Sequence, residues 1–296
     1  MEIVTLLKVL PGSFAQGLIW GIMALGVFIT YKVLDYADLT VDGSLCTGAA
    51  IGAMAIIGGV NPYIAMVLAF GGGMIAGLVT GILHTKFGIP AILSGILTQL
   101  ALYSINMRIM GRATQALSID QYNLIFSMRN VPQAIGISLI FVIAVIGALY
   151  WFFGTEIGCA VRSTGDNEAM SRAQGINTNV TKIIGLMISN GIVGLSGGLL
   201  AQYQGSADIQ MGRGAIVIGL AAVIIGQVVF GNRFNFSYKL GSIVGGAIIY
   251  YLVIALVLQM GLSTTDLKLF SAITVAVFLA IPYIKSNNRR RGVKNA

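Results

Sequence analysis

Three carboxylates stand close together where a long apolar stretch begins. Asp35, Asp38 and Asp42 lie within eight positions, in a chain with only 10 acidic residues. A carboxylate at such a place can cap a helix, because it accepts hydrogen bonds from free backbone N–H groups. It can also act inside a membrane, where acids carry protons or bind solutes. We favour a structural cap for Asp38, whereas for Asp42 a cap and a place in a gate or pathway both stay open.

The usual signatures of catalysis are missing from the sequence. The chain has no GxxxxGK[ST] phosphate loop and no GxSxG nucleophile motif. Its one histidine, His84, has no HExxH partner and no cysteine cluster beside it. We therefore expect no enzyme activity, no metal site and no cofactor in this chain.

The composition predicts an all-α polytopic membrane protein with about 8–10 transmembrane helices. Of the 296 residues 56% are hydrophobic and only 9% are charged, against about 25% in a soluble domain. Uncharged runs such as 9–31 and 54–83 exceed the roughly 20 residues that cross a bilayer core, although Lys8 and His84 adjoin them. The 39 glycines suit close helix contacts in a membrane. We expect a single membrane domain over 1–296.

Basic residues indicate how the chain is oriented in the membrane. Apolar stretches fall at about 12–31, 40–60, 63–83, 90–110, 134–153, 183–203, 214–231, 240–260 and 268–285. If each stretch crosses the membrane, 12 of the 18 Lys and Arg lie on the side of the C-terminal tail and 6 lie on the other. The positive-inside rule then places the C-terminus in the cytoplasm and the N-terminus outside. The net charge of +8 is explained in this way, without a nucleic-acid partner.

The joint at about 154–182 contains the segment "GDNEAMSRAQGIN". We predict a short amphipathic helix over 167–174, with Asp166 as N-cap, Glu168 in the first turn and Gly175 just after its end. Ala169, Met170 and Ala173 share one apolar face. This helix is either a connector at the lipid surface or a knob that docks into another protein.

Two stretches of the chain resemble each other. "ADLTVDGS" at 37–44 is echoed by "ADIQMGRG" at 207–214, and each opens an apolar stretch that two more follow. The alternating topology gives the two copies opposite orientations, which is the pattern of an inverted repeat in transporters. We expect repeat halves at about 36–110 and 206–285, with Asp38 and Asp208 as equivalent helix caps.

Polar side chains within apolar stretches must face protein or water, because unpaired polar groups are costly in lipid. Those on the fourth and sixth stretches are candidates for a solute pathway, and a helix–helix hydrogen bond is the alternative for each. Together with the opening acid the pathway candidates are Asp42, Thr98, Gln99, Asn106, Asn190 and Gln202. On the outer face we expect charged residues to steer a binding protein, and these are Arg112, Arg129, Asp208 and Arg213.

Several motifs resemble one family of membrane proteins. "GCAVRSTGDNEAMSRAQGINTNVTK" (158–182), "SNGIVGLSGGLLAQYQGSADIQMGRG" (189–214) and "DLTVDGSLCTGAA" (38–50) are similar to the permease subunit of ABC importers of the branched-chain amino acid and ribose type. Within this family, the sequence of residues 37–44 and the loop "RATQALSIDQYNLIF" most resemble the branch that is assigned to the transport of tryptophan, tyrosine or other amino acids. The spacing in "EAMSRAQG" departs from type I importers and favours a type II-like permease.

The resemblance implies several partners. A cytoplasmic ATP-binding subunit in two copies would hold ATP and magnesium, and an extracellular or periplasmic protein would deliver the solute. A second permease copy would complete a homodimer in the cell membrane, with a heterodimer with a related permease as the alternative. The short helix becomes a coupling helix that docks into the ATPase, with Arg162 and Arg172 at the rim of the contact. The coupling set is Arg162, Asp166, Asn167, Glu168, Ala169, Met170, Arg172 and Gly175.

Other functions stay open at this point. The repeat and the polar side chains also suit an ion-coupled secondary transporter or a channel, and a membrane enzyme or scaffold has no motif in its favour. Within the ABC family a small polar solute is expected. An amino acid is favoured, aromatic ones included, and nucleosides and sugars are the alternatives.

Overall fold

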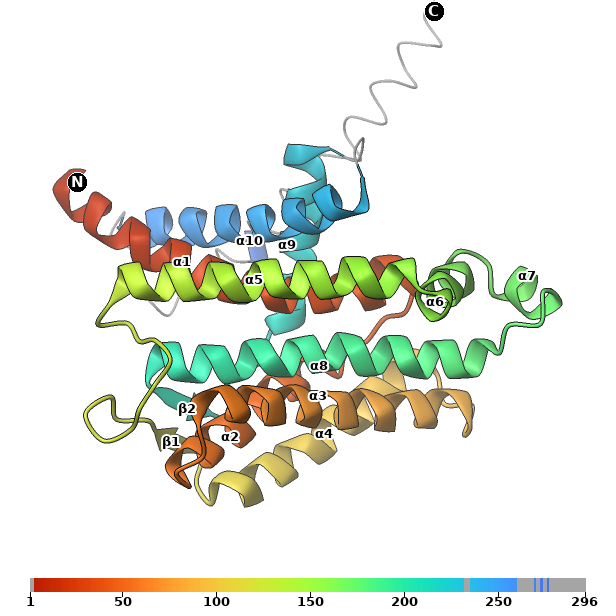
Figure 1. Ribbon diagram of the computed structural model, residues 1–296, viewed down its shortest axis with the longest axis horizontal. Coiled ribbons are helices and arrows are strands. Elements are labelled where there is room, and N and C mark those ends of the chain that lie inside the picture. The colour runs from red at the N-terminus through yellow and green to blue at the C-terminus, as the bar shows by residue number, and fades with distance from the viewer. Residues whose placement is uncertain (1–2, 232–234, 260–268, 270–271, 274–275, 277–296) are drawn as a thin grey trace, which may run out of the picture.

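Long helices dominate the computed structural model, which describes residues 3–231, 235–259, 269, 272–273 and 276. Most of them lie roughly parallel to one another (Figure 1). Five helices are long and apolar enough to cross a membrane, judged by length and composition among the described residues. In chain order the elements are α1 (Ile3–Phe28), the π-helix η1 (Ile29–Val33), α2 (Val41–Ile57), α3 (Pro62–Thr85), α4 (Ala91–Met110), β1 (Thr114–Ala116), α5 (Val131–Gly154), α6 (Glu156–Asp166), α7 (Glu168–Ala173), α8 (Thr178–Gln204), β2 (Ser206–Asp208), α9 (Ala215–Phe230) and α10 (Phe236–Gln259).

The first eight predicted apolar stretches are confirmed as helices, and the ninth, 268–285, lies almost wholly outside the described residues. Local signals set several of the boundaries. Asn61 caps α3 through a hydrogen bond from the amide of Tyr63, with a proline at the first helical position. Gly111 and Gly205 follow α4 and α8 with φ of 68° and 69°, a conformation that glycine adopts without strain.

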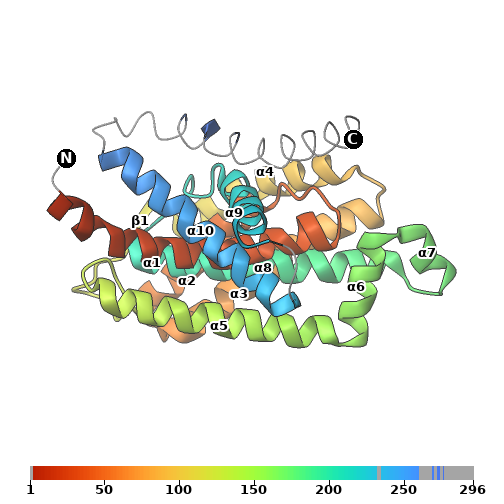
Figure 2. The same cartoon turned by 90° about the horizontal axis from the view of Figure 1, so that it is seen from above.

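Two of the apolar helices, α2 and α9, are shorter than the others and begin inside the bundle. Helix α2 has 17 residues and α9 has 16, which at 1.5 Å per residue is about 24–26 Å and less than the roughly 30 Å of a bilayer core. Helix α9 runs across the long helices in Figure 1 and is seen nearly end on in Figure 2. A helix over 214–231 was predicted to run parallel to the other spanning helices, and this direction is wrong. The chain leaves β2 and turns before α9 begins, so α9 lies across the long helices.

The bundle has two chemically different ends. At one end β1 pairs antiparallel with β2, with Thr114 opposite Asp208. At the other end lie α6 and α7 (Figure 1). Helix α10 begins at this second end, because the ring of Phe236 lies 5.2 Å from that of Phe153 at the end of α5. The segment from β2 to α10 thus still connects the two ends, as the predicted topology requires.

Glycines let α2, α3 and α8 touch backbone to backbone. A Cβ at Gly48 would collide with Gly194, one at Gly73 with the carbonyl oxygen of Asn190, and one at Gly197 with Leu45. Such close approach is the usual way in which membrane helices associate, because lipid gives no hydrophobic drive for their contact. This packing fixes the position of α8 against α2, and with it the polar residues that the two helices carry.

Substitutions at two glycines of α3 test this packing, because one glycine contacts α8 and the other does not. Gly73→Ala should lower the free energy of unfolding by about 1–3 kcal/mol, because the added methyl group meets backbone atoms of α8. Gly71→Ala has nothing within 4 Å of the new methyl group and should gain up to about 1 kcal/mol of helix propensity. The apparent midpoint of thermal unfolding in detergent measures both, and equal effects of the two changes would contradict this packing.

Candidate functional site

A buried polar cluster braces the segment that leads into α2. Asp38 is 2% exposed, and its carboxylate accepts hydrogen bonds from the amide of Thr40 at 2.9 Å and from Nδ2 of Asn190 at 2.7 Å. Ser44 donates to Oδ1 of Asn190 at 2.6 Å. The amide bonded by Asp38 belongs to the residue just before α2. Asp38 therefore fixes the entry of the helix and ties it to α8, rather than capping the first turn as we predicted.

Thr98 and Gln202 also have partners within the protein. A chain of hydroxyl groups runs from Thr40 through Thr80 to Thr98, with O–O distances of 2.7 and 2.9 Å. Gln202 accepts a hydrogen bond from the amide of Ile125 at 2.9 Å. Like Asn190, these two pathway candidates are buried and connect one element to another. Neither of the two cavities described below is lined by any of the three.

Asp42 joins the two short helices. It lies in the first turn of α2, but its carboxylate accepts hydrogen bonds from the amides of Gly214 at 3.0 Å and Ile216 at 2.9 Å. These are N–H groups at the start of α9, so Asp42 caps a helix far away in the sequence. The predicted cap of α9, Asp208, instead bonds the amide of Gln210, which lies too early in the chain to be part of the helix.

Three of the pathway candidates do meet. Asp42, Gln99 and Asn106 line one cavity of about 300 Å³ together with Tyr103 and Arg213. The cavity lies between the first turn of α2, one face of α4 and the connection from β2 to α9. Its volume is at the lower end of the roughly 300–1,000 Å³ of small-molecule sites, so the space suits a small solute.

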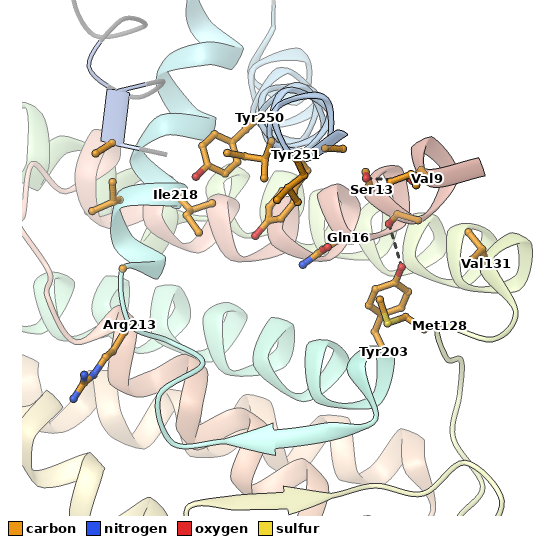
Figure 3. A pocket seen from close by; sticks show the side chains of 17 residues that line it. Val9, Ser13, Gln16, Met128, Val131, Tyr203, Arg213, Ile218, Tyr250 and Tyr251 are labelled. Atoms are coloured by element: carbon orange, nitrogen blue, oxygen red, sulfur yellow. Dashed lines mark hydrogen bonds between the residues drawn. The ribbon is translucent and has the colours of Figure 1, made fainter. Parts of the chain in front are cut away.

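A second, larger cavity lies on the other side of the connection to α9. It has a volume of about 830 Å³, and its wall consists mainly of aliphatic and aromatic side chains from α1, α9 and α10. Figure 3 shows Gln16, Tyr203 and Tyr251 around it, with the Tyr203 hydroxyl donating to a backbone carbonyl of α1. Arg213 borders both cavities, and its side chain points away from Tyr250 and Tyr251 (Figure 3).

The corner formed by α6 and α7 differs in part from its prediction. Helix α6 was not predicted, because its residues are too polar to form an apolar stretch. Asp166 therefore ends α6, and the N-cap of α7 is Asn167, whose side chain accepts a hydrogen bond from the amide of Met170 at 3.0 Å. Gly175, with φ of 83°, follows the helix end as predicted.

The apolar face of α7 points outward. Ala169, Met170 and Ala173 are exposed, and Met170 is 57% accessible. The opposite face packs on the protein through Ser171, which is 1% exposed and bonds the hydroxyl of Ser163. The short helix thus presents an apolar surface, held on a rigid polar base.

Glu168 fixes α7 to the start of α8. Its carboxylate pairs with Arg172 at 2.7 Å and with Lys182 at 2.8 Å, and Arg172 also donates to Thr178 at 2.8 Å. The hydrogen bond from the Lys182 ammonium is the main reason that the pKa of Glu168 is lowered. Arg172 is therefore held in place before any partner arrives.

Arg162 lies inside the corner. Its guanidinium donates to the carbonyl of Phe153 at 2.8 Å and stands 4.5 Å from the ring centroid of Phe236. This contact connects α6 to the end of α5 and the start of α10, through a cation–π interaction. Sequence reasoning placed Arg162 at an outer rim and missed this role, although aromatic residues at both helix ends were a visible signal.

Comparison with known proteins decides the family. Residues 10–282 match the family model described as the permease component of the branched-chain amino acid transport system. The chain belongs to this permease family. An all-α polytopic fold is thereby confirmed, as is membership of the ABC permeases.

Relatives of this permease are named for different solutes. It is 41% identical to the tyrosine transport system permease protein of Clostridioides difficile (strain R20291), over 94% of this chain and 93% of that one. It is 25% identical to the probable branched-chain amino acid transport permease protein LivH of Methanocaldococcus jannaschii, over 81% of this chain and 78% of that one. The ribose import permease protein RbsC of Escherichia coli (strain K12) is 26% identical, over 69% and 64%.

A solved structure shares the fold. A chain of PsaBC from Streptococcus pneumoniae, in complex with Fab, aligns with a TM-score of 0.52 over 95% of both chains at 16% identity. A likeness at this identity supports the arrangement of the helices and nothing finer.

The predicted docking residues gather at the strand end of the permease. Arg129 pairs with Asp120 at 2.7 Å, and both side chains are largely exposed. Arg112 is exposed directly after α4, and Asp208 bonds Thr114 across the two strands. Arg213 is also exposed, but it lines the cavities. Among the described residues no group of three or more potential metal ligands is found.

The cap on α9 can be tested by substitution. Asp42→Ala leaves two N–H groups of α9 without an acceptor and should lower the free energy of unfolding by about 1–2 kcal/mol. Asp35→Asn is the matched control, because Asp35 is exposed and its left-handed backbone suits asparagine. Thermal unfolding in detergent measures both. Equal stability of the Asp42→Ala variant and the parent protein would contradict the cap.

The ion pairs of Glu168 predict a dependence on pH. The folded pKa lies below the ordinary value of 4.5, so the stabilisation is complete above that value and is lost as pH falls through the folded pKa. Because the carboxylate is 37% exposed, we expect less than about 1 kcal/mol. Hydrogen exchange at 168–176, corrected for the intrinsic effect of pH, should rise on acidification. Glu168→Gln should remove this rise, whereas Glu156→Gln should preserve it.

Proposed function

We propose that this chain is the membrane subunit of an ABC importer that carries an amino acid, with tyrosine as the first candidate. The observation that carries the proposal is the α7 corner, a capped helix with an exposed apolar face and a braced polar base. Such a surface fits a cleft in a cytoplasmic ATPase. The similarity to a tyrosine permease over nearly the whole chain supports the solute class, and sugars and nucleosides are the alternatives.

The corner also supports an orientation in the membrane. If α7 docks into an ATPase, its end of the bundle faces the cytoplasm and the paired strands face outside. The N-terminus then lies outside, because the first turns of α1 lie at the strand end (Figure 1). The exposed charges of Arg112 and Arg129 at this end, with the half-buried Asp208 beside them, would meet the solute-binding protein.

A second copy of the permease would enclose the pathway. Helix α4 lines the 300 Å³ cavity and exposes apolar side chains such as Leu97, Leu100 and Ile105. A homodimer packed near this face would cover the cavity from the side. Two ATPase subunits would then dock, one on each α7, and would hold the ATP and magnesium.

Energy would pass from the ATPase to the pathway through rigid contacts. Closure of the ATPase dimer would move α7, and Glu168 would transmit the movement to α8. Arg162 would transmit it to α10, through Phe236. Coupling of this kind needs an element with two arrangements that both ends bias. The short helices α2 and α9 are that element, because they meet at a single carboxylate.

A secondary transporter is the second candidate. One observation favours it, namely the fully buried acid Asp38 on the segment leading into α2, since intramembrane acids often carry protons. Uptake by the purified chain alone, driven by a proton gradient in liposomes, would support this alternative.

Two methionines with equal exposure test the coupling surface. Met170→Asp should abolish co-purification of the partner ATPase, because a charge would enter the apolar contact. Met128→Asp is the matched control, since Met128 is also 57% exposed but lies between β1 and α5, at the strand end. The measurement is the amount of ATPase retained on the tagged permease and the ATP-driven uptake of the complex.

The control variant should keep the ATPase and its hydrolysis of ATP. Retention of the ATPase by Met170→Asp at the level of the parent protein would remove α7 as the docking element. Loss of the ATPase from both variants would point to a general defect of folding, which the midpoint of thermal unfolding would show.

A further inference from the structure

The 300 Å³ cavity contains one acid and one base that do not pair with each other. Asp42 accepts two backbone hydrogen bonds, whereas a carboxylate offers about four acceptor sites. Arg213 forms no ion pair within the described part of the chain. Both side chains line the cavity. The space between them is therefore bordered by unused acceptor sites of a carboxylate and by the donors of a guanidinium.

Asn106 is the second, independent observation. It lines the same cavity, it is 1% exposed, and neither its Nδ2 nor its Oδ1 has a hydrogen-bond partner among the described residues. Buried amides are nearly always paired, because water no longer satisfies them. This one differs from Asn190, whose amide is bonded on both sides. An unpaired donor and acceptor in a cavity wall indicate a ligand that brings one of each.

We propose that this cavity is a binding site in the permease itself for the zwitterionic head of an α-amino acid. Arg213 holds the carboxylate, Asp42 holds the ammonium group and Asn106 pairs with both. The assignment rests on the proposed function and adds to it, because it makes the membrane subunit selective for its solute. Arg213 thereby leaves the set of docking residues to which the sequence analysis assigned it.

The charge pattern separates amino acids from the other solutes of the family. A zwitterion brings one charge of each sign, and it compensates both Asp42 and Arg213. A ribose or a nucleoside is neutral and would bring no charge to pair with either Asp42 or Arg213. Tyr103 adds an aromatic ring to the wall, which suits an aromatic side chain on the solute.

Solute analogues test each half of the head group. The probes are L-tyrosine, tyramine, which lacks the carboxylate, and 3-(4-hydroxyphenyl)propionate, which lacks the ammonium group. The protein is the permease–ATPase complex in nanodiscs without the binding protein, and ligand-observed NMR reports weak binding. We expect tyramine and the propionate each to bind about tenfold or more weakly than tyrosine, and ribose not to bind.

Variants then assign the groups. Arg213→Gln should weaken the binding of tyrosine about tenfold or more and leave the binding of tyramine unchanged, because tyramine has no carboxylate for Arg213 to bind. Asn106→Leu should weaken the binding of tyrosine as well. Lys86→Gln is the control, because Lys86 is an exposed base directly after α3 that lines neither cavity, and it should leave the binding of tyrosine unchanged. Co-purified ATPase confirms that each variant is folded.

Different results would overturn this binding site and the proposed amino-acid importer. If Arg213→Gln weakened the binding of tyrosine and of tyramine equally, or of neither, the assignment of Arg213 to the carboxylate of the solute would be overturned. Import of tyrosine by a complex whose permease binds none of the probes would also overturn this site, but it would leave the importer intact. A complex that imports ribose and not tyrosine would instead refute the proposed amino-acid function.

Discussion

The contact between Asp42 and α9 is the constraint on which the rest of the structure depends. A helix that begins inside a membrane has free N–H groups in a medium without water, and they need an acceptor. Asp42 supplies it to Gly214 and Ile216 from the first turn of another short helix. Nearby, the amide of Gly212 donates a hydrogen bond to the sulfur of Cys46. This bond also holds the start of α9 against α2. The small cavity exists beside this junction because neither helix continues through it.

The junction lies between two regions that have different tasks. Toward one end of the bundle, α6 and α7 present an apolar face that is held by Glu168 and Arg162. Toward the other end lie the paired strands and exposed charged side chains such as Arg112 and Arg129. Helices α8 and α10 connect the two regions, and both contact the same corner. A displacement of α7 therefore has a rigid route toward the short helices. This arrangement suits the proposed function, in which an ATPase docks at one end of the permease and the solute arrives at the other.

The sequence was sufficient for features that depend on local patterns. Apolar runs predicted most helices, and "NEAMSRAQG" predicted the helix α7 with Gly175 after it. What failed depended on contacts between distant segments. Nothing local shows that Asp42 bonds α9 rather than its own helix, that Arg162 lies over Phe236, or that Asn190 is satisfied while Asn106 is not. The crossing direction of α9 follows from that packing and was equally hidden. The inverted repeat stays a prediction, supported by the alike turns at Asp38 and Asp208, each of which bonds the amide two residues on.

The central claim is that an amino acid passes the junction of α2 and α9 in this permease. Cryo-electron microscopy of the complex with its ATPase and binding protein, trapped during turnover with tyrosine, tests it most directly. We predict solute density in the small cavity, with the carboxylate at Arg213 and the Asp42 cap on α9 still formed. Density for tyrosine in the larger apolar cavity, with the small one closed, would contradict the account.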